Sequence, residues 1–313
     1  MGRESWSVAI LNLETILSHY ILIPHSYFHA FKEHRNASLK RLVEVLVHLK
    51  LNLKKATFAI QYLYKPKMIG IMSAMREEIQ ALLNHLEHTE QYTKGKRDYY
   101  KGILFGKEAV LVFSRWGKVA SATTATQLIN DFDVDELIFT GVAGAIRPDL
   151  NIGDTVIGKQ LVQHDMDASP LYDIFEIPLL HKTFFETHQD KRKQLTNACQ
   201  LFIKNYTDVI SKNEARNLQI TDPKVVIGDI TSGDQFISKQ SQVSFITTHL
   251  ESVVCAEMEG AAVAQVCYEY EVPFSIMRVI SDKANSDAHV DFPLFVEQIA
   301  SKYAYGIFKN YFQ

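Results

Sequence analysis

Cysteine is scarce in this chain of 313 residues. The three cysteines, Cys199, Cys255 and Cys267, are odd in number, show no Cys-x-x-Cys spacing and lie among apolar neighbours. These features exclude a disulfide framework and indicate reduced core thiols, which are typical of cytoplasmic proteins. We therefore expect a cytoplasmic location.

Long apolar runs are also missing. Glu14, His19 and Pro24 interrupt the best candidate for a bilayer-spanning helix, so the sequence predicts no membrane span. Near the N-terminus, Glu4 follows Arg3 directly and no small-residue cleavage site comes after them, so we expect no signal peptide.

A basic excess is absent, because the formal net charge is -3. Nucleic-acid-binding proteins usually carry clustered positive charge, so we expect no nucleic-acid partner. His164, Asp165 and Asp167 are close in sequence, but no second group at ligand spacing completes a metal site. The glycine-rich segment 140–145 lacks the G-x-G-x-x-G order, which disfavours a dinucleotide-binding fold. We predict neither metal nor cofactor.

Residues 68 to 313 show apolar strands that alternate with helical patterns, without internal repeats or low-complexity linkers. This alternation predicts one α/β domain with a central mixed β-sheet flanked by helices. The patterns place strands at 68–72, 109–114, 136–140, 154–162, 225–230, 252–255 and 274–280, and helices at 76–83, 118–131, 190–206, 260–270 and 292–312.

Several acids lie at predicted strand ends or helix starts, where they could carry chemistry. Asp282 follows the β-branched strand 274–280, at the carboxyl end where open α/β sheets bind ligands, although alone it would be explained as a helix N-cap. Glu78 lies in the first turn of a helix, where the helix dipole alone would favour it. Glu257 and Glu259 precede a small-residue helix and are hard to explain as core.

These acids lie in segments that resemble, in the same order, the motifs of the methylthioadenosine/S-adenosylhomocysteine nucleosidases of the nucleoside phosphorylase superfamily. The resemblance runs from about Met68 to the C-terminus. The segments are Gly70 to Glu78, Ser114 to Ala120, Thr140 to Ala145, Ser232 to Ile237, Ala256 to Glu259 and Arg278 to Asp282.

The resemblance implies the catalytic roles. Asp282 would protonate N7 of the leaving adenine, and Glu78 would activate the attacking water. Arg278 would lie on the water side, and Ser114 near the ribose and the water. Arg115 stands where the family more often has glycine, and its guanidinium could bind an anion.

The resemblance also implies the substrate-binding residues. Phe236 would stack on adenine, although it could equally be a core residue, and the backbone near Ile237 would read the purine edge. Glu259 would accept hydrogen bonds from the ribose hydroxyls, which suits a carboxylate. Met75 would line the pocket, and Met258 would pack on the sugar. Ser281 would orient the catalytic acid, and Phe292 would close over the 5′ end of the substrate.

Taken together, the implied reaction is hydrolysis of the N-glycosidic bond of S-adenosylhomocysteine, 5′-methylthioadenosine or both, by a homodimer that needs no cofactor. The preference between the two substrates stays open. One alternative is a purine nucleoside phosphorylase, although the residues Ile138, Phe139 and Thr140 offer no arginine for phosphate. A second alternative is a purine-nucleoside-binding protein without catalytic activity.

Residues 1–67 differ from the rest in charge. They carry ten Lys/Arg against four Asp/Glu, whereas residues 68–313 carry 23 against 32. Apolar residues at helical spacing between 39 and 49 predict a basic amphipathic helix. We interpret it as a helical extension packed on the domain or a partner subunit, and favour contact with a membrane surface less. A third interpretation is that Met68 is the true first residue, so that residues 1–67 are absent from the native protein.

Overall fold

The computed structural model describes residues 67–285 and 288–313. The extension predicted over residues 1–67 lies outside the described residues, apart from Lys67 at its end. Among the described residues, no helix combines the length and the apolar character that crossing a bilayer requires.

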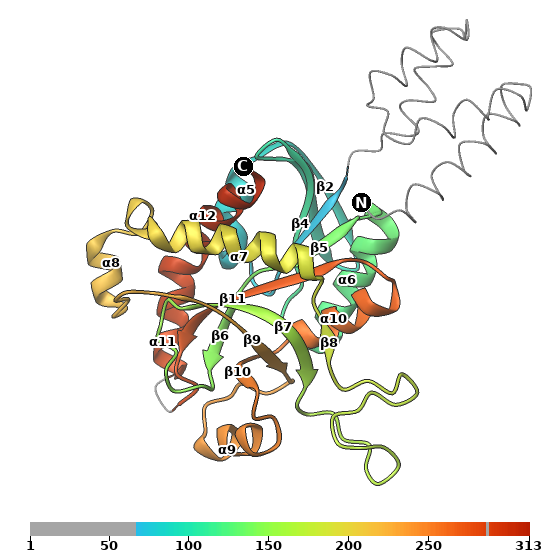
Figure 1. Ribbon diagram of the computed structural model, residues 1–313. Coiled ribbons are helices and arrows are strands. Elements are labelled where there is room, and N and C mark those ends of the chain that lie inside the picture. The colour runs from blue at the N-terminus through green and yellow to red at the C-terminus, as the bar shows by residue number, and fades with distance from the viewer. Residues whose placement is uncertain (1–66, 286–287) are drawn as a thin grey trace, which may run out of the picture. The chain divides into compact units, whose positions relative to one another are not determined.

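A single mixed sheet forms the centre of the described chain (Figure 1). Its strand order is β2-β3-β4-β1-β5-β11-β6-β10-β9-β7-β8, and β11 also pairs with β7. The strands are β1 Ile69–Ser73, β2 Leu86–Lys94, β3 Arg97–Leu104, β4 Lys107–Phe113, β5 Glu136–Phe139, β6 Val142–Ala145, β7 Thr155–Gln163, β8 Phe185–Glu186, β9 Val225–Ser232, β10 Val253–Glu257 and β11 Phe274–Asp282.

Helices cover both faces of this sheet. On one face α5, α7 and α12 share a core cluster, and on the other α6 and α10 share a second one. The helical elements are α5 Arg76–Asn84, α6 Lys118–Phe132, α7 Gln189–Lys204, η2 Tyr206–Asp208, α8 Lys212–Asn217, α9 Gln240–His249, α10 Gly260–Glu269, α11 Ala288–Phe295, the π-helical turn η3 Val296–Ala300 and α12 Ser301–Phe312.

The strand β11 explains how one sheet can be buried on both sides. Successive side chains of a strand point to opposite faces, and here Met277 and Val279 enter the first cluster while Ile276 and Ile280 enter the second. Every residue of β11 is buried. The strand pairs with β5 near its start, with β7 at its middle and with β6 near its end, so it connects the two halves of the sheet.

The predicted fold class, one α/β domain with a central mixed sheet flanked by helices, is confirmed. Several local expectations need correction. The strands β2, β3 and β8 and the helices α8 and α9 were not predicted. The glycine-rich turn contains the short strand β6, and the C-terminal helix begins at Ala288 and is divided by the turn η3. The strand β2 escapes the apolar pattern because its side chains from Glu87 to Thr93 are all exposed.

Candidate active site

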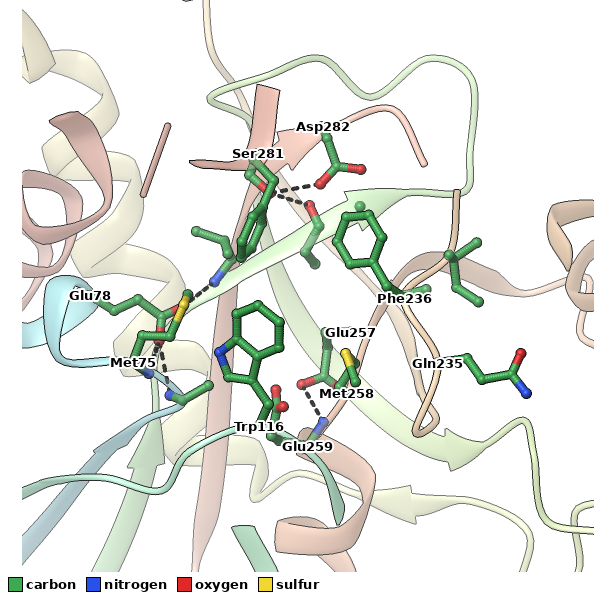
Figure 2. Close-up of a pocket in the computed structure, with 17 residues that line it drawn as sticks. Met75, Glu78, Trp116, Gln235, Phe236, Glu257, Met258, Glu259, Ser281 and Asp282 are labelled. Carbon is green, nitrogen blue, oxygen red and sulfur yellow. Dashed lines mark hydrogen bonds between the residues drawn. The ribbon is translucent and has the colours of Figure 1, made fainter. Parts of the chain in front are cut away.

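The carboxyl ends of β1, β10 and β11 meet around one cavity, which Figure 2 shows with its lining side chains. Ligands of open α/β sheets bind at such strand ends. The cavity brings together nine of the eleven site residues expected from the sequence: Met75, Glu78, Phe236, Ile237, Met258, Glu259, Ser281, Asp282 and Phe292. Glu78, Glu259 and Asp282, which are far apart along the chain, therefore share one space.

Glu78 is buried in the first turn of α5 and is held by three backbone groups. The N–H groups of Ala74 and Met75 donate to its Oε2 at 2.9 Å, and the N–H of Val142 donates to its Oε1 at 3.0 Å. Burial raises the pKa of Glu78 to about 6, against the opposing charge of Arg278 and the three N–H groups. The carboxyl group is thus fixed in position and titrates close to neutrality, which suits a general base.

Asp282 ends β11 and is 2% exposed. The Ser281 hydroxyl donates to its Oδ2 at 2.9 Å, and the Ala284 N–H donates to its Oδ1 at 2.8 Å. Burial raises the pKa of Asp282, and the negative charge of Asp291 raises it further. A raised pKa favours the protonated form that a proton donor needs. Gly144 permits this placement, because a Cβ there would lie 2.8 Å from Oδ1.

Glu259 lies across the cavity at the start of α10, where its Oε1 accepts a hydrogen bond of 2.8 Å from the Gly117 N–H. Burial raises the pKa of Glu259, and the negative charge of Glu257 raises it further. Glu257 also lines the cavity. From the sequence, Glu257 is an acid that is hard to explain as a core residue, but we predicted no role for it.

Two expected residues lie outside the cavity wall. Arg278 is 1% exposed, and its Nη2 forms an ion pair of 2.7 Å with Glu257. Ser114 is fully buried at the end of β4, and its hydroxyl donates to the carbonyl oxygen of Arg115 at 2.7 Å. Arg115 is not a lining residue either, and its guanidinium donates to the Lys96 carbonyl oxygen.

Aromatic rings form one wall of the cavity. The Phe292 ring makes edge contacts with Phe236 and Trp116, at centroid distances of 5.7 and 5.8 Å. Phe236 is 38% exposed, so it is not the core residue of the alternative interpretation. Trp116 was missed as a site residue. Trp116 lies in the loop after β4, where no periodic pattern in the sequence indicates that the indole points into the cavity.

The His164 cluster has a structural role in the described chain. The imidazole Nδ1 of His164 lies 3.1 Å from the Thr231 hydroxyl oxygen, and burial lowers the pKa of His164. Asp165 is paired with Lys118 at 2.5 Å. Among residues 67–285 and 288–313, no group of three or more His, Cys, Asp or Glu side chains is arranged to hold a metal ion.

Comparison with known proteins places this geometry in a family. Residues 68–313 match the model of the phosphorylase superfamily. A 5′-methylthioadenosine/S-adenosylhomocysteine nucleosidase of Staphylococcus aureus is 35% identical over 234 residues, which cover 74% of this chain and 94% of that protein.

Solved structures agree with this match. A 5′-methylthioadenosine/S-adenosylhomocysteine nucleosidase of S. pneumoniae, with a transition-state inhibitor, superposes with a TM-score of 0.67 at 30% identity, covering 78% of this chain and 98% of that one. The futalosine hydrolase of Helicobacter pylori superposes with a TM-score of 0.65 at 33% identity, covering 78% and 97%. The chain therefore belongs to the phosphorylase superfamily and, within it, to the family of the 5′-methylthioadenosine/S-adenosylhomocysteine nucleosidases.

Proposed function

We propose that this protein hydrolyses the N-glycosidic bond of 5′-methylthioadenosine, S-adenosylhomocysteine or both, and releases adenine. The observation that carries the proposal is the shared cavity of Glu78, Glu259 and Asp282. Cleavage of such a bond passes through an oxocarbenium-like sugar, so it is helped by a proton donor at the base, an activated water and a hydrogen-bond acceptor at the sugar hydroxyls. Each acid supplies one of these.

In the proposed mechanism Asp282 gives its proton to N7 of the adenine, and Ser281 holds the carboxyl group in place. Glu78 takes a proton from the water that attacks C1′. Glu259 accepts hydrogen bonds from the ribose hydroxyls, which strengthen as positive charge develops on the sugar. Arg278 acts on the water side through its charge, and Ser114 supports the strand end next to the ribose.

The apolar lining residues would bind the rest of the substrate. Phe236 stacks on the adenine, and the backbone at Ile237 reads the purine edge. Met258 packs on the sugar. Met75 lines the pocket, and Phe292 closes over the 5′ end.

Water is favoured over phosphate as the nucleophile by the charges of the cavity. No lining residue from the described part of the chain is a lysine, arginine or histidine. The guanidinium of Arg278 lies behind the wall and is paired with Glu257. A phosphate ion would therefore meet Glu78 without an unpaired positive partner, which disfavours the phosphorylase alternative.

The test is adenine release from both substrates, measured with and without phosphate. Release that is independent of phosphate supports the hydrolase, whereas release that requires phosphate identifies a phosphorylase. Asp282→Asn should lower kcat by about 10²–10⁴-fold while substrate binding stays measurable. A chain that binds adenine nucleosides but releases no adenine would be the non-catalytic binding protein.

We further propose a cytoplasmic homodimer. Three buried free cysteines support the location. Val119, Leu171 and Leu179 are apolar side chains that are each at least 79% exposed, and a partner subunit would cover such side chains. Sedimentation velocity would give the oligomeric state, and a monomer at micromolar concentration would contradict the dimer.

We also propose that the chain has two parts, a catalytic domain of residues 68–313 and an extension of residues 1–67. The superfamily match begins at residue 68, which supports this boundary. N-terminal sequencing of the native protein would show whether the chain begins at Met1 or at Met68.

A further inference from the structure

Glu257 is a fourth buried acid at the cavity, and the proposed mechanism gives it no task. It ends β10, is 7% exposed and lines the cavity beside Met258 and Glu259. Burying a carboxylate without partners is costly, so its surroundings indicate what it does.

Donors surround the Glu257 carboxylate. The Gly260 N–H donates at 2.8 and 2.9 Å to its two oxygens, the Glu259 N–H donates at 3.2 Å, and the Ser232 hydroxyl donates to its Oε1. Arg278 adds the charged partner at 2.7 Å. These donors and Arg278 together hold the side chain of Glu257 in one position at the end of β10.

The ion pair fixes Arg278 next to Glu78. The guanidinium lies 4.1 Å from the Phe139 ring centroid, and its Nη1 donates to the Met277 carbonyl oxygen at 3.1 Å. A Cβ on Gly141 would lie 3.4 Å from that Nη1 and 2.7 Å from Oε1 of Glu78. Arg278 and Glu78 therefore face one small space beside the Gly141 backbone, and only Glu257 among the described residues forms an ion pair with Arg278.

The charged groups that act on Glu259 are Glu257, Arg278 and Glu78. Glu257 repels a negative charge on Glu259, and Arg278 attracts one. His164 also faces Glu257, but burial lowers its pKa and so favours its neutral form. The pair Glu257–Arg278 thus acts on both Glu259, which would bind the sugar, and Glu78, which would activate the water.

We propose that Glu257 is a positioning residue, whose carboxylate holds Arg278 against Phe139 beside Glu78 and sets the charge balance between Glu78 and Glu259. This inference rests on the proposed function, because it concerns residues of that site. Glu257 itself touches no reacting atom in this mechanism.

The kinetic test compares Glu257→Gln with the wild type in the pH profile of kcat/KM for adenine release. Without Glu257, no negative charge offsets the positive charge of Arg278, so the pKa of Glu78 falls. The acid limb of the profile, where kcat/KM declines toward low pH, should then move down by about one pH unit. Glu257→Asp keeps the charge and should restore the limb. Glu251→Gln, an exposed acid before β10, should change nothing.

A second variant covers the case in which Glu257→Gln does not fold because Arg278 is left unpaired. Glu257→Gln with Arg278→Met removes both charges and leaves Glu78 without a positive neighbour. Its acid limb should then move up instead of down. A purely structural role for Glu257 would lower kcat at every pH without moving the limb in either variant, which would overturn the proposal.

An infrared measurement keeps this test separate from the proposed function. The carbonyl band of protonated Glu259, assigned by its loss in Glu259→Gln, is titrated in the empty protein. Its midpoint should move to lower pH in Glu257→Gln, and an unchanged midpoint would overturn the inference. If the wild type releases no adenine but the midpoint moves, the proposed function fails and the role of Glu257 stands.

Discussion

At the scale of single residues, the cavity holds buried acids whose pKa values are raised and whose hydrogen-bond partners differ. Glu78 is held by three N–H groups, whereas Asp282 is held by one N–H and one hydroxyl and feels the charge of Asp291. Raised pKa values of acids that line one cavity are typical of groups that exchange protons. An acid and a base can therefore act side by side in one site.

The pH profile should carry the signature of Glu78. Because its pKa is about 6 and the ionised form must accept the proton of water, kcat/KM should fall about tenfold for each pH unit below that value. Glu77→Gln changes the exposed acid of the same helical turn and should leave the profile as it is. An acid limb near the ordinary pKa of glutamate would contradict the role given to Glu78.

Gly141 should tolerate no side chain. The Cβ of Gly141→Ala would lie 2.7 Å from Glu78 Oε1, in the space that Glu78 and Arg278 face, so we expect kcat to fall about 100-fold. Gly70→Ala is the matched control, because a Cβ there makes only ordinary contacts of 3.4 Å or more. Steady-state kinetics of the two variants would decide, and equal rates would show that this space is not used.

At the scale of elements, the ends of the strands position the acidic side chains of the site, and the helices pack against the strands. Glu257 ends β10, Asp282 ends β11, and Glu78 lies in the helix α5 that follows β1. All three strands, β1, β10 and β11, are completely buried. Such strands appear in a sequence as continuous apolar runs, so the sequence could predict them. Acids directly after these runs could be predicted as site residues for the same reason.

Other features could not be predicted from local patterns. The pair Glu257–Arg278 joins residues 21 positions apart, and neither side chain indicates its partner by spacing. The strand β2 is mostly exposed and polar, so alternation gives no signal for it. Trp116 follows β4 in a loop, where periodicity carries no information about which way the indole points.

The crossing of α7 and α12 should be sensitive to volume. A Cβ on Gly306 would lie 2.3 Å from the Phe202 ring, so Gly306→Ala should lower the free energy of unfolding by about 1–3 kcal/mol. No residue of either helix lines the cavity, so kcat/KM of the folded protein should not change. Denaturant unfolding and kinetics on one preparation test both statements, and a loss of activity without a loss of stability would contradict them.

At the scale of the whole molecule, the site depends on the complete sheet. Its lining residues run from Ala74 to Phe292, and the strands that carry them are separated along the chain but close in the sheet order. The order itself, in which β11 lies between β5 and β6, requires long-range pairing that apolar patterns do not encode. The fold class could be predicted from the sequence, whereas the strand order could not.

Stability should also depend on pH through Glu78. Its folded pKa of about 6 lies above its ordinary value of 4.5, so its protonation stabilises the empty protein at low pH, and that contribution is lost as pH rises through about 6. The loss corresponds to about 2 kcal/mol. The difference in unfolding free energy between wild type and Glu78→Gln, followed from pH 4.5 upward, measures it. A constant difference would contradict the burial argument.

The chain has two tryptophans, Trp6 and Trp116. Because Trp116 lines the cavity at 53% exposure, its indole is a built-in optical reporter of occupancy (Figure 2). With Trp6 replaced by phenylalanine, the remaining tryptophan emission comes from the cavity alone. Ligand binding should quench or shift that emission, so the affinity for a nucleoside can be measured without a label. The measurement also works for the Asp282→Asn variant, whose turnover is too slow to report binding.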